Sequence, residues 1–187
     1  MNLMHDVPLG DKAPKEFNVI IEIPKGSSNK YEIDKETGLI KLDRVLYSAV
    51  FYPTDYGFLP QTYYEDGDAL DALVLATYPF LPGIIVQSRP VGMIKMVDNG
   101  EKDDKLIVVP VDDPRFRKIK DMKDLNDHFK QEIKNFLETY KNLEGKEVKV
   151  TGLRGVKDAL DLVKKGIFMY KEEFSKKEKQ EIGDGKE

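Results

Sequence analysis

The chain has 187 residues, and its 34 acidic and 30 basic side chains give a net charge of −4. This weak charge gives no electrostatic basis for binding nucleic acid or an anionic membrane, and the most hydrophobic window, residues 69–86, is too interrupted by Asp71, prolines and a glycine to span a bilayer. The absence of cysteine and of an apolar signal segment in residues 1–15 leads us to expect a cytoplasmic protein without disulfides.

Short β-strands are predicted for the first half of the chain. Residues 17–23 are rich in β-branched side chains, and Glu22 is an acid inside this apolar run. Two further strands are expected at 31–34 and 39–46, separated by polar turns. Residues 48–59 are mostly aromatic or small, so we expect an ordered loop there.

More strands are expected in the middle of the chain, at 72–76, 83–90 and 91–97. Asn99 and Gly100 then signal a tight hairpin, because both residues tolerate the positive φ angles that such turns need. Residues 106–111 are expected to be the returning strand.

Helices are predicted only near the end. Apolar residues recur at helical spacing from Leu125 to Tyr140, with Asp121 or Asp124 available as the N-cap. A strand at 146–153 and a shorter helix ending near Gly166 are expected to follow. Strands that precede two helices predict a mainly β fold with some α structure: an antiparallel barrel with the helices packed outside. We expect residues 1–170 to form one domain and residues 171–187 a charged, partly frayed extension.

Three aspartates crowd the segment Asp66-Gly67-Asp68-Ala69-Leu70-Asp71. Carboxylates this close repel one another unless a cation neutralises them, and Gly67 permits a backbone that turns all three inward. Oxygen ligands without cysteine favour Mg²⁺ or Mn²⁺ over Zn²⁺. A solvated acidic turn is the alternative, and the glycine position does not fit an EF-hand.

A second acidic group lies at the expected hairpin tip and consists of Asp98, Glu101, Asp103 and Asp104. Hairpin tips are often simply solvated, but a barrel could bring this tip to the first group. Two facing groups would hold more than one metal ion, which suits chemistry on a phosphate-rich substrate. The donors available for phosphate are Lys30, Arg44, Lys105, Tyr140, Lys141, Tyr52 and Tyr56, each of which has an alternative as a surface charge or a packing ring. His5 and His128 are expected to be structural or at the surface.

The aspartate segment and its companions resemble the family I soluble inorganic pyrophosphatases of the prokaryotic type. The resemblance covers residues from about 6 to 170, and the segments that carry it in order are 19–24, 30–34, 42–44, 51–53, 55–57, 66–71, 89–92, 95–98 and 140–141. It implies an OB-like five-stranded barrel, Mg²⁺-dependent hydrolysis of pyrophosphate to two orthophosphates with Mn²⁺ as a possible substitute, and a homohexamer.

The resemblance also implies a role for each site residue. Asp66, Asp71 and Asp103 would hold the metals that activate water, and Asp68 would be the general base. Asp98 and Asp103 would bind a further Mg²⁺, with Glu22 and Glu32 in the outer metal shell. The phosphate-binding residues would be Lys30, Arg44, Tyr56, Lys105, Tyr140 and Lys141, with Lys30, Arg44 and Tyr56 also catalytic and Tyr52 ordering the site.

The sequence departs from the family pattern at two places. Ala69 and Leu70 stand where relatives often have proline and valine, outside the ligands. Asp104 directly follows Asp103, which makes Asp103 a weaker assignment than Asp66 and Asp71.

Two other functions remain open. A metal phosphohydrolase of nucleotides or polyphosphate would use the same acidic groups, although no glycine-rich phosphate loop is visible. An OB-fold module for single-stranded nucleic acid would use Tyr52, Tyr56 and Phe58 as a stacking platform, but its groove should be basic.

Overall fold

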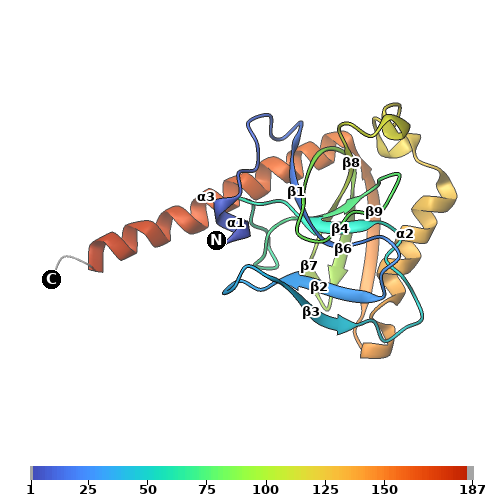
Figure 1. Ribbon diagram of the computed structural model, residues 1–187, viewed down its shortest axis with the longest axis horizontal. Helices are drawn as coiled ribbons and strands as arrows, with labels where there is room; N and C mark the ends of the chain where they lie inside the picture. The colour runs from blue at the N-terminus through green and yellow to red at the C-terminus, as the bar shows by residue number, and fades with distance from the viewer. Residues whose placement is uncertain (1, 185–187) are drawn as a thin grey trace.

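Five strands close into a barrel in the computed structural model, which describes residues 2–184 and the side chains of residues 2–174. In order around the barrel these are β1 (Phe17–Ile23), β4 (Asp55–Phe58), β5 (Asp71–Val74), β8 (Lys105–Pro110) and β6 (Ile85–Asp98), and β6 pairs with β1 to complete the circle (Figure 1). β7 (Glu101–Lys102) and β9 (Val148–Gly155) both pair with β6, and β2 (Asn29–Ile33) and β3 (Ile40–Val45) form a separate hairpin sheet. The expected OB-like barrel is confirmed.

The two larger hydrophobic cores lie on the two faces of the barrel strands. Along β8, Leu106 and Val108 join the core under α3 (Val156–Asp184), whereas Ile107 and Val109 join the core under α2 (Asp127–Thr139). Successive side chains of a strand point to opposite faces, so a strand that is apolar at every position can serve both cores. The two helices therefore cover different faces of the barrel (Figure 1).

Strand positions differ from expectation at three points. β4 lies inside the segment expected to be a loop, and Gly57 explains it, since a Cβ there would lie 1.9 Å from the carbonyl oxygen of Ile20 in β1. The two strands expected at 83–90 and 91–97 are the single strand β6, with a bulge between Pro90 and Gly92 that accommodates the proline. β5 and β8 pair in parallel, so the barrel is not antiparallel throughout.

Helix α2 begins after Asn126, whose side chain accepts hydrogen bonds from the backbone nitrogens of His128 and Phe129. The expected caps, Asp121 and Asp124, instead form a capping box around the 3₁₀ turn η2 (Met122–Asp124). The N-cap prediction was wrong because both aspartates cap the 3₁₀ turn that precedes the helix.

Helix α3 does not end near Gly166 but continues to Asp184, and its last part projects past the barrel (Figure 1). A Cβ on Gly166 would lie 2.4 Å from Cδ1 of Leu70, so the glycine permits close packing inside the helix. Residues 171–184 are thus helical in the backbone, and residues 185–187, part of the extension expected to fray, lie outside the described residues.

The remaining elements are short: α1 (Leu3–Asp6), η1 (Pro114–Phe116) and η3 (Asn142–Glu144). Within residues 2–184, no helix combines the length and apolar character needed to cross a membrane.

Candidate active site

The acidic loop, residues 59–70 between β4 and β5, bends sharply at Gly67. This glycine has φ +84°, and its nitrogen donates to the carbonyl of Tyr64 over 3.0 Å. The bend places Asp66 and Asp68 beside Asp71, the first residue of β5, and all three line one cavity of about 240 Å³. The structure thus brings together the three aspartates of the sequence motif.

Three other strands complete the wall of this cavity. Glu22 comes from β1, Lys30 and Glu32 from β2, and Tyr56 from β4. The hairpin sheet of β2 and β3 therefore supplies side chains to a site on the barrel, although it is not paired with the barrel strands.

A second hollow of about 250 Å³ shares Asp66 with the first. Its other lining residues include Asp98, Asp103 and Lys141. The expected hairpin is present, with positive φ at Asn99 and Gly100, and it carries the second acidic group to the acidic loop. Asp66 is the point at which the two acidic groups meet.

Lys105 lies between these groups and is only 3% exposed. Its ammonium donates to Asp71 Oδ2 over 2.7 Å and to Asp103 Oδ1 over 2.9 Å. Burial alone would lower the pKa of Lys105, but the charges of Asp71 and Asp103 raise it well above its usual value. Tyr56 also donates its hydroxyl to Asp71, so this carboxylate has two donors.

Several carboxylates are short of positive charge. Burial, followed by the charges of Asp103 and Asp71, raises the pKa of Asp66 to about 6. Burial and the charge of Asp71 raise the pKa of Glu22 to about 8, although Ile33 donates its backbone nitrogen to the Glu22 carboxylate over 2.9 Å. Burial also raises the pKa of Asp103 despite the nearby Lys105.

This set of side chains fits a hard divalent cation. It offers only oxygen ligands, and an added positive charge would relieve the repulsion that raises their pKa values. Within the described residues, no three acidic or histidine side chains form a ready-made metal cage. Lysines contact several carboxylates instead: Lys30 pairs with Glu32, Lys105 with Asp71, and Lys141 with Asp98.

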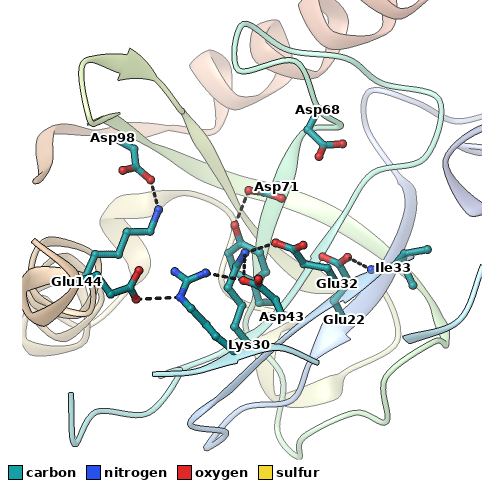
Figure 2. Close-up of polar contacts among 12 residues, drawn as sticks. Glu22, Lys30, Glu32, Ile33, Asp43, Asp68, Asp71, Asp98 and Glu144 are labelled. Atoms are coloured by element: carbon teal, nitrogen blue, oxygen red, sulfur yellow. Dashed lines mark hydrogen bonds and ion pairs between the residues drawn. The ribbon is translucent and has the colours of Figure 1, made fainter. Parts of the chain in front are cut away.

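Lys30 and Arg44 belong to one network that includes two acids to which sequence reasoning assigned no role (Figure 2). Asp43 accepts from Lys30 over 3.1 Å and also contacts Arg44, whose Nε donates to Glu144 Oε1 over 2.9 Å. Asp43 could have been selected from its position next to Arg44. The pairing of β2 with β3 places Lys30 opposite Arg44, so Asp43 lies near both cations. Glu144 gave no signal, because it lies far from Arg44 in sequence.

Tyr52 and Tyr140 belong to a buried aromatic group at the edge of the site. The Tyr52 ring packs 5.7 Å from Tyr56 and 4.9 Å from Phe136, and Tyr140 is stacked on Phe136 at 5.1 Å. Burial raises the pKa of Tyr140 to about 12, so its hydroxyl stays protonated near neutral pH. Tyr52 and Phe58 are 4% and 7% exposed, which does not suit a platform for stacking bases.

Asp103 and its neighbour Asp104 have different surroundings. Asp104 is 4% exposed, and its carboxylate accepts from the Tyr64 hydroxyl over 2.8 Å and from the Met96 nitrogen over 3.2 Å. Only Asp103 lines the second hollow. The structure therefore separates the two aspartates that the sequence left side by side.

Asp68 is exposed, with 57% of its side chain accessible to solvent. Its Oδ1 accepts from the Ala69 nitrogen over 2.9 Å, and its Oδ2 lies 3.2 Å from the ammonium of Lys35, a residue that sequence reasoning did not select. His5 contacts Tyr170, and His128 lies 3.7 Å from Glu132, so neither histidine belongs to the site.

The barrel and its facing carboxylates, ammonium groups and tyrosine hydroxyls define an enzyme that acts on a small polyanion. Residues 19–171 match the family model for inorganic pyrophosphatase. An inorganic pyrophosphatase of Picrophilus torridus is 50% identical over 171 residues, which cover 91% of this chain and 97% of the relative. One of Thermus thermophilus is 53% identical over 171 residues, or 90% of this chain and 98% of the relative.

A solved structure agrees with these sequence matches. The crystal structure of inorganic pyrophosphatase from Thermus thermophilus superimposes with a TM-score of 0.89 at 52% identity, covering 91% of this chain and 99% of that one. The chain belongs to the inorganic pyrophosphatase family.

Proposed function

We propose that the protein hydrolyses inorganic pyrophosphate to two orthophosphates in a reaction that depends on Mg²⁺. The observation that carries this proposal is the meeting of two acidic groups at Asp66, opposite the cations Lys30 and Lys141. Pyrophosphate is small and highly charged, so its binding must rely on cations and hydrogen-bond donors more than on apolar contact. The family membership supports the same reaction.

The substrate is held by donors from several elements. Lys30 and Arg44 come from the hairpin sheet, Lys105 from β8, and Tyr140 and Lys141 are the two residues that follow α2. Tyr56 adds a hydroxyl, which burial and the charge of Asp71 keep protonated by raising its pKa. Tyr52 orders the site by packing against Tyr56.

Mg²⁺ would be held by Asp66, Asp71, Asp98 and Asp103, with Glu22 and Glu32 in the outer shell, and Mn²⁺ could replace it. When bound, the ion supplies charge neutralisation and lowers the pKa of the attacking water. The support for this assignment is the all-oxygen donor set together with the raised pKa values of Asp66, Glu22 and Asp103.

Asp68 is the general base in this proposal. The hydrogen bond from Ala69 orients Oδ1, and Oδ2 has only an exposed ion pair with Lys35, so the carboxylate lies at the cavity wall and is accessible to water. This carboxylate would take the proton of the attacking water.

A cytoplasmic homohexamer is the expected working form. The support is the resemblance to prokaryotic enzymes, together with large exposed apolar side chains such as Leu39, Tyr78 and Leu81. A sedimentation mass equal to that of the 21.4 kDa chain would contradict the oligomer.

The first experiment is phosphate release from pyrophosphate with Mg²⁺, compared with the same reaction in excess chelator and with ATP as substrate. Rapid release from pyrophosphate that stops in chelator supports the proposal. Equal release from ATP would favour a nucleotide phosphohydrolase. No release from any of these by the folded protein would reject hydrolysis and return attention to single-stranded nucleic acid.

A further inference from the structure

Tyr64 and Asp104 form a buried link between the two acidic groups. Tyr64 is on the acidic loop, two residues before Asp66, and Asp104 follows Asp103 at the start of β8. The two side chains are 2% and 4% exposed, and the Tyr64 hydroxyl donates to Asp104 Oδ2 over 2.8 Å.

The Asp104 carboxylate is fixed at both oxygens. Its Oδ1 accepts from the Met96 nitrogen in β6 over 3.2 Å, so the carboxylate is attached to the barrel wall. A tyrosine hydroxyl is protonated near neutral pH, so Tyr64 is the donor in this hydrogen bond. A hydrogen bond to a buried charged acceptor is stronger than one between neutral groups.

The link opposes a repulsion. Asp66 and Asp103 line the same hollow, so their two negative charges lie close together. The acidic loop is a connection outside regular structure, so without an anchor these two carboxylates can move apart and reduce their repulsion. The hydrogen bond between Tyr64, near Asp66, and Asp104, next to Asp103, fixes the distance between these two proposed metal ligands.

We propose that Tyr64, through Asp104, is a positioning residue that sets the separation of Asp66 and Asp103 and thereby the affinity of the site for Mg²⁺. This inference rests on the proposed function for its catalytic meaning but not for its test. Tyr64 touches neither substrate nor metal in this proposal, because its hydroxyl is bonded to Asp104.

The chain offers a matched control. Lys102 lies 3.4 Å from Glu65, so it joins the same two segments at the surface, where the two side chains are 46% and 37% exposed. An exposed ion pair contributes little, and K102Q removes a surface link between the acidic loop and the hairpin without touching the buried one.

The test is calorimetric titration of MgCl₂ into Y64F, K102Q and the unaltered protein, without substrate. Changes in groups that support metal ligands typically weaken affinity by about 10 to 100-fold, so we expect at least about a 10-fold weaker Mg²⁺ affinity in Y64F and no change in K102Q. The Mg²⁺ concentration for half-maximal hydrolysis should rise by the same factor in Y64F, with kcat at saturating Mg²⁺ nearly unchanged.

A second variant separates positioning from stability. In Y64F the buried Asp104 carboxylate loses the hydroxyl that donates to it. The double variant Y64F/D104N also removes the negative charge of Asp104, and the asparagine oxygen can still accept from the Met96 nitrogen. We expect this double variant to recover thermal stability but to keep the weak Mg²⁺ affinity, and it carries the measurement if Y64F does not fold. Unchanged affinity in a folded variant without the hydroxyl, or no Mg²⁺ binding by the unaltered protein, would overturn the inference. Mg²⁺ binding without hydrolysis of pyrophosphate would instead reject the proposed function alone.

Discussion

Lys105 donates to Asp71 over 2.7 Å from a side chain that is 3% exposed, and the same ammonium reaches Asp103 over 2.9 Å. When no metal is present, the lysine therefore neutralises both Asp71, at the start of β5, and Asp103, in the connection before β8. Removing one partner of a buried ion pair leaves an uncompensated charge, which is far more costly than losing an exposed pair.

The variant K105M should therefore lose about 3 to 5 kcal/mol of unfolding free energy in chelator. Saturating Mg²⁺ should restore part of that loss, because the cation neutralises the same carboxylates. Urea denaturation with and without Mg²⁺ measures both values. K102M removes an exposed lysine three positions away, and its free energy of unfolding should differ from that of the unaltered protein by no more than about 1 kcal/mol. Equal losses in the two variants would contradict the role assigned to Lys105.

Glu22 gives the metal-free protein an unusual dependence on pH. Its pKa is about 8 in the folded chain against an ordinary 4.5, so the folded state holds the proton more tightly than the unfolded state does. A raised carboxyl pKa contributes stability at low pH that is lost as pH rises through the folded value. The stability of the chelated protein should therefore fall between about pH 4.5 and pH 8.

The variant E22Q isolates this effect, since its amide oxygen can still accept from Ile33. We expect E22Q to be more stable than the unaltered protein at pH 8 in chelator and to show a flatter pH profile there. Mg²⁺ should also bind the unaltered protein more tightly as pH rises, because the ion competes with protons on Glu22 and Asp66. Thermal unfolding across pH, and proton release on Mg²⁺ binding, measure the two effects; identical pH profiles for both proteins would exclude Glu22 as their source.

Local sequence signals predicted the parts of the fold that depend on near neighbours. The hairpin at Asn99 and Gly100 and the apolar strand β1 follow from residue preferences alone. Gly57 and Gly166 were misread because their reason is a distant contact, with Ile20 in one case and Leu70 in the other. A glycine that permits close packing looks the same in sequence as one that ends an element.

The candidate site shows the same limit. Crowding of like charges indicated Asp66, Asp68 and Asp71, since uncompensated repulsion is visible in one segment. Glu144 was not selected, and Asp104 was counted only as a member of the second acidic group, because their contacts with Arg44 and Tyr64 join residues that are distant in sequence. The sequence therefore indicated a group of carboxylates that the structure brings together, but not the distant side chains that contact them.

Asp68 can be tested without disturbing the fold. Its side chain is 57% exposed and its ion pair with Lys35 is at the surface, so D68N should keep the melting temperature nearly unchanged. General base catalysis typically contributes about 100 to 10,000-fold, and kcat should fall by at least about 100-fold. Phosphate release at saturating Mg²⁺ measures this. K35Q is the matched control, because it removes the same ion pair but keeps the base; a kcat loss in K35Q equal to that in D68N would point to the pair and not to the carboxylate.

Gly166 connects α3 to the acidic loop. Its carbonyl accepts from the Tyr63 nitrogen over 3.0 Å, and an added Cβ would lie 2.4 Å from Leu70 Cδ1 and 3.3 Å from Thr62 Cβ. Leu70 is 1% exposed and directly precedes Asp71, so it has little room to move without shifting a proposed metal ligand.

Alanine is normally the better helix former by about 1 kcal/mol, yet overpacking a core costs about 1 to 3 kcal/mol. We expect the second effect to exceed the first in G166A, with a net loss of stability and a higher Mg²⁺ requirement for hydrolysis. G166A/L70V removes volume at the point of contact and should recover both properties in part, which urea denaturation and Mg²⁺ activation curves measure. If G166A is more stable than the unaltered protein, the helix propensity of alanine outweighs the overpacking, and the added methyl group does not displace Leu70 of the acidic loop.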